Sequence, residues 1–404
     1  LSPIRYNEGP GIKLSDTVLF HPGVWVGGGY DSNINFSNEY DGNRPIVGVG
    51  FLRVVPHLAL ATSAPQRLEE KDGGKVARPT IFLRLDAALS FREYFLTDGD
   101  VSAYKKAGVD LDSWRHVFEV ESNLNFILFP GRFFSLEIFD GYNRTLAPWP
   151  GAGQIGRHMN RGGLKFVLSP GGGLLSFGVG YANNLDWLES DTYKAYRKMT
   201  HEVLFTAKWK VLPKSAVFLD VNWQYSTYLD DTAAAAGRID SMPLRVSLGY
   251  TGLFTPKFGV LLRAGYGGSF HDTLESYNML VAQLELSYYI GPFAKLSFGY
   301  QHDFKDSLIT SYAVDERLYL RYDHLIINRI LIHIEGDYRY RQHQGLSAAQ
   351  ETANLDPPKN HIIEADAGLD WRIKDWINIG VGYNLQYRLL SSQPIPVAGT
   401  TTGR

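Results

Sequence analysis

The sequence contains no cysteine, and only 4 of its 404 residues are methionine. Without cysteine, thiolate metal sites and disulfide frameworks are excluded. The chain also lacks an excess of charge of either sign, because it has 40 Lys+Arg and 42 Asp+Glu. Nucleic-acid binding normally needs a basic stripe, so no nucleic acid is expected among the partners.

The chain also lacks any apolar run near the roughly 18 residues that a membrane helix needs. It begins at Leu1 without a basic leader, so we expect any export signal to have been removed or not to be shown. A β-barrel stays compatible with these absences. Its backbone hydrogen bonds are made between strands, and its hydropathy signal is weak.

What is abundant is glycine and aromatic side chains, with 41 Gly, 24 Tyr, 22 Phe and 8 Trp. This enrichment fits strands and turns better than helices. Period-two alternation supports the same view and is clearest from Leu331 to Arg341. One face holds Ile332, Ile334, Gly336, Tyr338 and Tyr340, and the other holds His333, Glu335, Asp337, Arg339 and Arg341. A strand separates these two sets, whereas a helix would mix them.

The alternation recurs along almost the whole chain and predicts about 17 strands of about 9–11 residues. Bacterial barrels usually have an even number of strands, so we expect about 16–18, with 18 favoured. The predicted centres lie near Val24, Val49, Leu85, Val120, Leu136, Phe166, Val179, Phe205, Val221, Val246, Leu262, Leu284, Phe298, Leu320, Ile334, Ala367 and Val381.

The predicted connections are alternately short and long, as in outer-membrane barrels, whose short turns face the periplasm. Pro and Gly favour tight turns at the short side. Short turns are expected at 130–132, 169–173, 212–215, 255–257, 291–292, 327–328 and 374–375. Long loops are expected near 31–45, 97–113, 145–158, 184–198, 229–241, 271–278, 303–312 and 342–360, and residues 62–78 are expected to form an extended periplasmic turn.

The domain boundaries follow from this pattern. Residues 1–16 are expected to be an N-terminal periplasmic segment, 17–390 the transmembrane barrel, and 391–404 a loop. The last predicted strand ends on the long-loop side, so we expect a closing strand beyond Arg404. A second option is a strand within residues 1–13.

A soluble sandwich, propeller or solenoid would also alternate, but such strands average about five or six residues and no repeat of fixed period is present. Aromatic rings favour the membrane interface. They are expected at the long-loop side of the apolar face at Tyr30, Tyr181, Tyr225, Tyr250, Tyr266, Tyr300, Tyr340 and Tyr387, and at the opposite side at Trp209 and Trp371. The sequence therefore predicts an all-β transmembrane antiparallel barrel in a lipid bilayer.

The stretch from Gly27 to Phe36 reads Gly-Gly-Gly-Tyr-Asp-Ser-Asn-Ile-Asn-Phe and follows Leu19-Phe20-His21-Pro22-Gly23. It resembles the first strand of outer-membrane β-barrel proteins of diderm bacteria. Some of these belong to exopolysaccharide export or to the gliding motility of myxobacteria, and the alternation along the chain resembles porin-like barrels. The resemblance implies a bacterial outer-membrane location. The terminal aromatic of such barrels is absent at Arg404, in line with a missing last strand.

If the apolar faces meet lipid, the polar faces line a lumen in which positive and negative charges alternate. Such charges either form structural ladders or set the selectivity of a constriction. The densest cluster lies on three consecutive predicted strands and is the candidate constriction. It comprises Arg317, Arg321, Asp323, Glu335, Asp337, Arg339, Glu364, Asp366, Asp370 and Arg372.

No catalytic, metal or cofactor site is expected, since the 11 histidines are scattered and no Gly-x-Ser-x-Gly elbow occurs. The leading hypothesis is therefore a non-enzymatic conduit for hydrophilic solutes or a polysaccharide. An alternative is a structural anchor that binds periplasmic or outer-membrane protein partners in a motility or envelope-spanning complex. A third hypothesis is an outer-membrane hydrolase.

Overall fold

The computed structural model describes residues 11–15, 17–34, 46–62, 80–106, 114–149, 153–234, 238–271, 276–306, 312–344 and 359–390. These residues form one antiparallel sheet of 18 strands with three short helices. None of the described helices is long and apolar enough to cross a membrane. The strands are β1 (Ile12–Lys13), β2 (Val18–Asp31), β3 (Val49–Thr62), β4 (Ile81–Tyr94), β5 (His116–Leu128), β6 (Phe134–Trp149), β7 (Gly153–Leu168), β8 (Leu175–Leu188), β9 (Lys198–Leu212), β10 (Ser215–Tyr228), β11 (Ser241–Thr255), β12 (Phe258–His271), β13 (Tyr277–Tyr289), β14 (Ala294–Asp306), β15 (Tyr312–Ile326), β16 (Ile330–Gln344), β17 (Lys359–Lys374) and β18 (Ile377–Leu390), and the helices are α2 (Asp98–Lys106), α3 (Pro170–Gly173) and the 3-10 helix η2 (Asp191–Tyr196).

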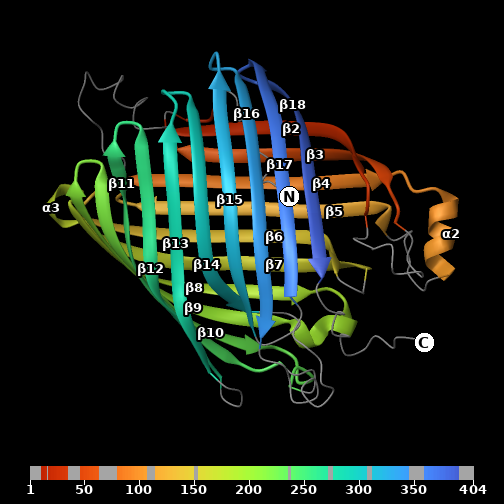
Figure 1. Cartoon of the computed structure of the whole chain (residues 1–404). Coiled ribbons are helices and arrows are strands. Elements are labelled where there is room, and N and C mark those ends of the chain that lie inside the picture. Colours follow the sequence, from red (N-terminus) through yellow and green to blue (C-terminus); the bar gives the residue numbers. More distant parts are fainter. Residues whose placement is uncertain are drawn as a thin grey trace.

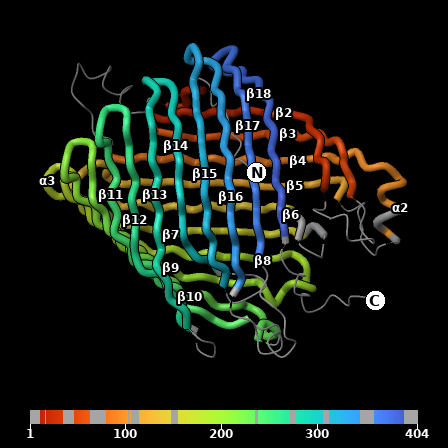
Figure 2. Tube along the Cα trace, viewed as in Figure 1, coloured from red at the N-terminus to blue at the C-terminus, as the bar shows by residue number. Residues whose placement is uncertain are grey.

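Every strand pairs with the next one along the chain, always antiparallel. Figure 1 shows the result, with strands β11–β18 passing in front of β2–β9 and crossing them. The tube in Figure 2 shows the same two walls joined through β10. Strands tilted against a barrel axis cross in this way when a barrel is seen from the side.

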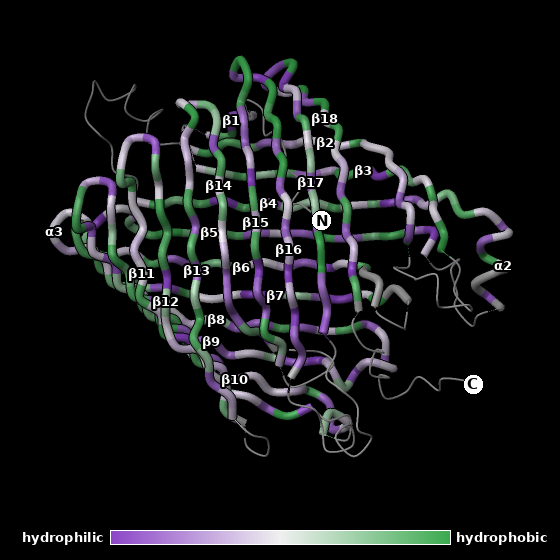
Figure 3. The backbone as a smooth tube through the Cα atoms, in the orientation of Figure 1, coloured by the Kyte–Doolittle hydropathy of each residue, from purple (hydrophilic) through white to green (hydrophobic). Residues whose placement is uncertain are grey.

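The two ends of this barrel differ. Short turns and α3 gather at one end, which we call the short-turn end, whereas α2 lies at the opposite, long-loop end (Figure 1). In outer-membrane barrels the short turns face the periplasm. Figure 3 shows polar and apolar residues alternating along the strands between the two ends.

The sheet is left open between β2 and β18, which share no register pairs in the described chain. Both strands run from the short-turn end to the long-loop end, so an antiparallel closure takes one further strand between them. The two residues of β1 pair with β2 on this edge, Ile12 opposite Phe20 and Lys13 opposite Leu19. A closing strand beyond Arg404, and most of the alternative strand within 1–13, lie outside the described residues.

The predicted architecture is confirmed: each of the 17 predicted centres lies in a strand of its own. The predicted lengths are wrong, because the strands other than β1 have 13–16 residues. Much of the loop expected at 145–158 is strand, since β6 extends to Trp149 and β7 starts at Gly153. On β7 the backbone ladder continues through Gln154, Arg157 and His158, which a pattern based on the apolar belt does not count.

Two smaller expectations were also wrong. Val49 is the first residue of β3 and not its centre. Tyr250 lies toward the short-turn end of β11, because β11 follows a long loop and ends at the turn after Thr255. The extended turn expected at 62–78 lies outside the described residues except for Thr62, which ends β3.

The turn between β15 and β16 holds an unusual backbone conformation. Ile327 and Asn328 adopt positive φ angles of 53° and 56°, and the N–H of Arg329 donates to the carbonyl of Ile326 at 3.0 Å. Asn tolerates this left-handed region, but a β-branched residue is strained there. The Ile327 side chain is 82% exposed, so little packing offsets that strain.

Replacing Ile327 with glycine should therefore stabilise the barrel by about 1 kcal/mol, because glycine adopts positive φ freely. Urea unfolding of the refolded protein in lipid or detergent would measure the change. Ile330→Gly is the matched control: Ile330 starts β16 outside the left-handed region, so its loss should lower the unfolding free energy. A lower stability of Ile327→Gly than of the wild type would contradict the strain argument.

Candidate functional site

The two faces of the sheet have opposite chemistry. The apolar side chains of Leu320, Ile334 and Val381 are 51%, 49% and 72% exposed. Their sequence neighbours Arg321 and Glu335 form an ion pair on the other face. An exposed apolar face on the outside and a charged face on the inside is the arrangement of a barrel in lipid.

The candidate constriction is assembled on β15, β16 and β17. Arg317 donates to Asp337 through Nε and to Glu335 Oε1 at 3.1 Å. Arg321 donates to the same Glu335, at 2.9 Å to Oε2. Arg339 lies 3.4 Å from Asp337 Oδ1. The cluster therefore forms one continuous network and not a set of separate pairs.

The register explains why part of this network is diagonal. Arg317 lies directly opposite Arg339, and Asp337 lies directly opposite Glu364. Like charges at directly opposite positions repel, so Arg317 and Arg339 turn toward carboxylates two residues along, whereas Arg321 pairs with Glu335 directly opposite. Arg339 reaches Glu364 at 3.6 Å in this way, and the side chain of Asp337, only 4% exposed, is shared by two guanidinium groups.

His333 joins the cluster although its sequence position gave no sign of a partner. Its Nδ1 lies 2.7 Å from Asp323 Oδ1, and its Nε2 lies 3.5 Å from Asp366 Oδ1. Asp323 and Asp366 come from the strands on either side of β16. Within the described residues, no group of three His, Asp or Glu has the geometry to hold a metal ion.

Two members of the predicted cluster are not part of this network. Asp370 and Arg372 form no ion pair within the described chain. They lie at the short-turn end of β17, where the Arg372 N–H donates to the carbonyl of Arg329 at 2.7 Å. The structure therefore brings together eight of the predicted residues and leaves Asp370 and Arg372 beside the turn.

A second inner cluster lies across β3, β4 and β5. Glu119 accepts a hydrogen bond from Arg53 at 3.1 Å, and Arg92 lies 3.6 Å from the same carboxylate oxygen. Ser90 accepts from Arg53 Nε at 2.6 Å. Glu119 is only 8% exposed, so the two arginines offset the cost of burying its charge.

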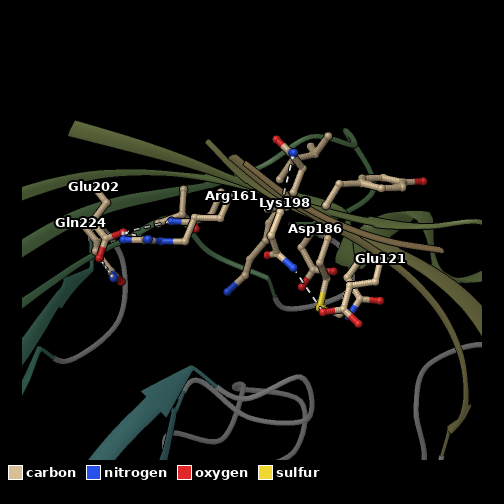
Figure 4. A pocket seen from close by; sticks show the side chains of 15 residues that line it. Glu121, Arg161, Asp186, Lys198, Glu202 and Gln224 are labelled. Carbon is tan, nitrogen blue, oxygen red and sulfur yellow. Dashed lines mark hydrogen bonds and ion pairs between the residues drawn. The ribbon is translucent and has the colours of Figure 1, made fainter. Parts of the chain in front are cut away.

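A third cluster lines a cavity of about 520 Å³ on the inner face of β5–β10. Glu202, 5% exposed, accepts from Arg161 at 2.8 Å, from Asn222 and from Gln224 at 3.4 Å. Figure 4 shows Arg161, Glu202 and Gln224 gathered together, with Asp186, Lys198 and Glu121 farther along the cavity. Asp186 accepts from Arg157 Nε at 2.7 Å.

The sequence analysis did not single out this third cluster. Glu202 is isolated among Leu204, Thr206 and Lys208 on its strand, so charge density along the chain does not reveal it. Its partners come from the two adjacent strands and from β7, and they meet only through the strand register. The register of a sheet is the signal that was missing.

At the long-loop rim, Glu189 follows β8 and contacts Arg144 and His158. It accepts from Arg144 Nε at 2.6 Å and lies 2.8 Å from His158 Nε2. The hydrogen bond from Arg144 lowers the pKa of Glu189 below its ordinary value of 4.5. A lowered carboxylate pKa means that Glu189 stabilises the folded state above pH 4.5, and that this contribution disappears as the pH falls through the folded-state pKa.

Asp337→Asn should lower the unfolding free energy by about 2 kcal/mol, because two guanidinium groups lose a buried counter-charge. Urea unfolding at neutral pH measures the loss. Asp370→Asn is the matched control on the neighbouring strand, and its effect should stay within about 0.5 kcal/mol. Equal losses for the two variants would show that the network contributes nothing specific.

Glu189→Gln should lower the unfolding midpoint at neutral pH, and the difference from the wild type should shrink as the pH falls below 4.5. Unfolding curves collected between neutral and acid pH test this. Glu316→Gln is the control, because Glu316 is 3.8 Å from its partner His302 and its side chain is 49% exposed. A pH-independent difference for Glu189→Gln would contradict the assignment.

No family model matches the sequence, and none of the curated proteins matches it. Solved structures do match. The FrpB iron transporter from Neisseria meningitidis is similar with a TM-score of 0.51 at 8% identity, over 93% of this chain and 62% of that one. A BenF-like porin from Pseudomonas fluorescens Pf-5 is similar with a TM-score of 0.50 at 8% identity, over 92% of this chain and 93% of that one.

At this level of identity the similarity concerns the fold alone, and the chain spans only 62% of the length of the iron transporter. Three observations point to the same fold: the two similar structures, the antiparallel sheet of 18 strands and the exposed apolar outer face. The fold of this chain is that of the bacterial outer-membrane β-barrels, as the sequence predicted.

Proposed function

We propose that the chain is an outer-membrane channel for small hydrophilic solutes. The observation that carries the proposal is the inner face of the sheet, where charged side chains are paired in a network on β15–β17 and beside the cavity on β5–β10. Such a face can line a water-filled lumen. It also gives a passing solute hydrogen-bond donors and acceptors in place of its hydration shell. An apolar inner face would instead form a packed core.

Pairing also predicts what the channel selects. The network on β15–β17 holds three arginines against five carboxylates, and Arg161 is paired with Glu202, so opposite charges offset one another over most of these walls. A wall of neutralised pairs gives a weak field of either sign. We therefore expect weak discrimination between small cations and anions, with neutral and zwitterionic solutes passing as well.

The names of the similar structures support a transport role, since one is a transporter of iron and the other a porin. Neither name is that of an enzyme. Export of a polysaccharide, an anchoring role in gliding motility and outer-membrane hydrolysis stay alternative hypotheses, and these similarities do not favour any of them. A channel and an anchor differ in one measurable property, the passage of ions.

The purified chain in planar lipid bilayers should give steady single-channel currents with weak ion selectivity. Arg317→Gln combined with Arg321→Gln removes two positive charges and leaves the carboxylate of Glu335 without an arginine partner, while Asp337 keeps only Arg339. The reversal potential in a salt gradient should then shift toward cation selectivity. Arg329→Gln, in the turn between β15 and β16, is the control and should leave the reversal potential unchanged.

Folded protein that inserts into the bilayer without conducting would contradict a channel and favour an anchor. A current with the same reversal potential in the wild type and the double variant would instead remove β15–β16 from the conduction path. Swelling of liposomes in sugars of increasing length extends the test to cargo. Uptake restricted to small sugars supports the proposal, whereas uptake of long oligosaccharides favours a polysaccharide conduit.

A further inference from the structure

The apolar belt on the outside of the barrel is interrupted on β6 and β7. On β4 the outward positions are apolar along nearly the whole strand, from Ile81 to Phe91. On β6 only Phe134, Leu136 and Ile138 continue this belt, and the next outward residues are Asp140, Tyr142 and Arg144. On β7 the apolar series Leu168, Phe166 and Leu164 is likewise followed by Gly162, Asn160 and His158.

The polar residues of this interruption form one surface, which we call the outer polar patch: Asp140, Tyr142, His158, Asn160 and Asn183. The register aligns Asp140 with Gly162 and Gly162 with Asn183 of β8. Asn160 Nδ2 donates to Asp140 Oδ2 at 3.1 Å, and Tyr142 Oη lies 2.7 Å from His158 Nδ1. The patch therefore crosses three neighbouring strands.

The residues between these positions establish that the patch faces outward. Phe139 and Arg161 point inward, since the Arg161 guanidinium lies 5.0 Å from the Phe139 ring centre and pairs with Glu202. Asp140 follows Phe139 directly, and Asn160 directly precedes Arg161. Asp140 and Asn160 therefore lie on the opposite, outward face. Around the patch, Ile138 and Leu164 are each 40% exposed, as expected of side chains in contact with lipid.

The depth of the patch follows from strand geometry. Three alternating apolar positions cover about 13 Å along a strand at about 3.4 Å per residue. A tilt of about 40° reduces this to about 10 Å of height, less than half of the apolar band of about 25 Å in such barrels. The patch therefore begins inside the band, where lipid tails supply no hydrogen-bonding partner.

We propose that the outer polar patch is the surface at which a second copy of this chain docks within the membrane. Copies inserted in the same orientation hold their patches at the same depth, so two patches meet by rotation about the membrane normal alone. The patch holds a carboxylate acceptor at Asp140 and amide groups at Asn160 and Asn183, of which Asn160 Nδ2 bonds Asp140 and Asn183 Nδ2 lies 3.3 Å from His201 Nδ1 within the chain. Gly162, between Asp140 and Asn183, leaves the surface flat enough for close approach.

Other occupants fit less well. A hydrophilic solute does not enter the lipid band from the side, and phosphate headgroups lie at the interface and not within the band. An unrelated membrane protein would need its own polar groups at matching depth, which a second copy has by construction. The inference depends on the orientation of the barrel in the membrane and not on whether the barrel conducts.

The first test is the particle mass of the wild type, extracted in mild detergent and measured by light scattering. An assembly of two or more chains is expected, and a single chain would overturn the proposal. The triple variant Asp140→Leu, Asn160→Leu and Asn183→Leu completes the apolar belt and should release single folded chains. The control His302→Leu with Glu316→Leu changes an outward polar pair on β14–β15 and should leave the assembly intact.

A triple variant that folds and keeps the assembly of the wild type would also overturn the proposal. A second measurement covers the case in which that variant fails to fold. Because the chain has no cysteine, Asn160→Cys and Asn183→Cys each give one reactive thiol for a flexible bismaleimide applied to intact cells. An adduct of two chains is expected from these variants and not from Leu320→Cys on β15.

The identity of the adduct separates the remaining occupants. Two chains linked at position 160 or 183 support docking of a second copy. A link to a different protein would replace it with a foreign partner. Labelling without any link would mean that lipid or detergent covers the patch. These last two results both overturn the proposal.

Discussion

The need to pair every backbone N–H and C=O inside lipid underlies the whole structure. A strand in the bilayer has no water to bond, so it bonds its neighbours, and the antiparallel ladder follows from β1 to β18. The ladder in turn fixes which residues face lipid and which face the interior. One slip of register would move Leu320 and Ile334 inward and place Arg321 and Glu335 against lipid tails. The side-chain chemistry and the backbone bonding therefore enforce each other.

The same ladder determines how the interior charges are neutralised. Residues directly opposite on neighbouring strands are fixed in pairs, and on β15–β17 several of those pairs have like charge. The long arginine side chains reach along the strands to a diagonal carboxylate, so one acidic group serves two cations. This makes the wall a network in which no single charge acts alone. A substitution there changes the partners of its neighbours as well as its own charge.

The sequence was sufficient for what is local and periodic. Alternation along Leu331–Arg341 requires no knowledge of other strands, and it correctly predicted a strand with the charged residues on one face. The structure joins eight of the ten residues of the predicted cluster in one network, and their role as a constriction stays a prediction. The sequence did not predict contacts that depend on the pairing of one strand with another. The proximity of Glu202 to Arg161 is set by register between segments far apart in sequence, and His333 acquires its two carboxylates from the strands on either side.

Strand ends were the other source of error. The apolar belt covers only the part of a strand within lipid, while the ladder runs on through residues such as Gln154, Arg157 and His158 of β7. Asp370 and Arg372 stay outside the network for a similar reason. Their charges suggested that they belong to the cluster, but they lie nearer the short-turn end of β17 than its other members. Tyr250 was placed at the wrong end although the short turn predicted at 255–257 already puts the end of β11 at the short-turn side.

The unequal height of the apolar belt has a consequence for the surrounding bilayer. Along β6 and β7 a lone barrel would offer lipid a short apolar wall, and along β4 a tall one. Acyl chains adapt to such a mismatch by thinning locally, or the barrel leans until the two heights even out. A leaning barrel would carry its α2 end off the membrane normal and aim its mouth sideways. Shielding the short wall from lipid would hold the barrel upright.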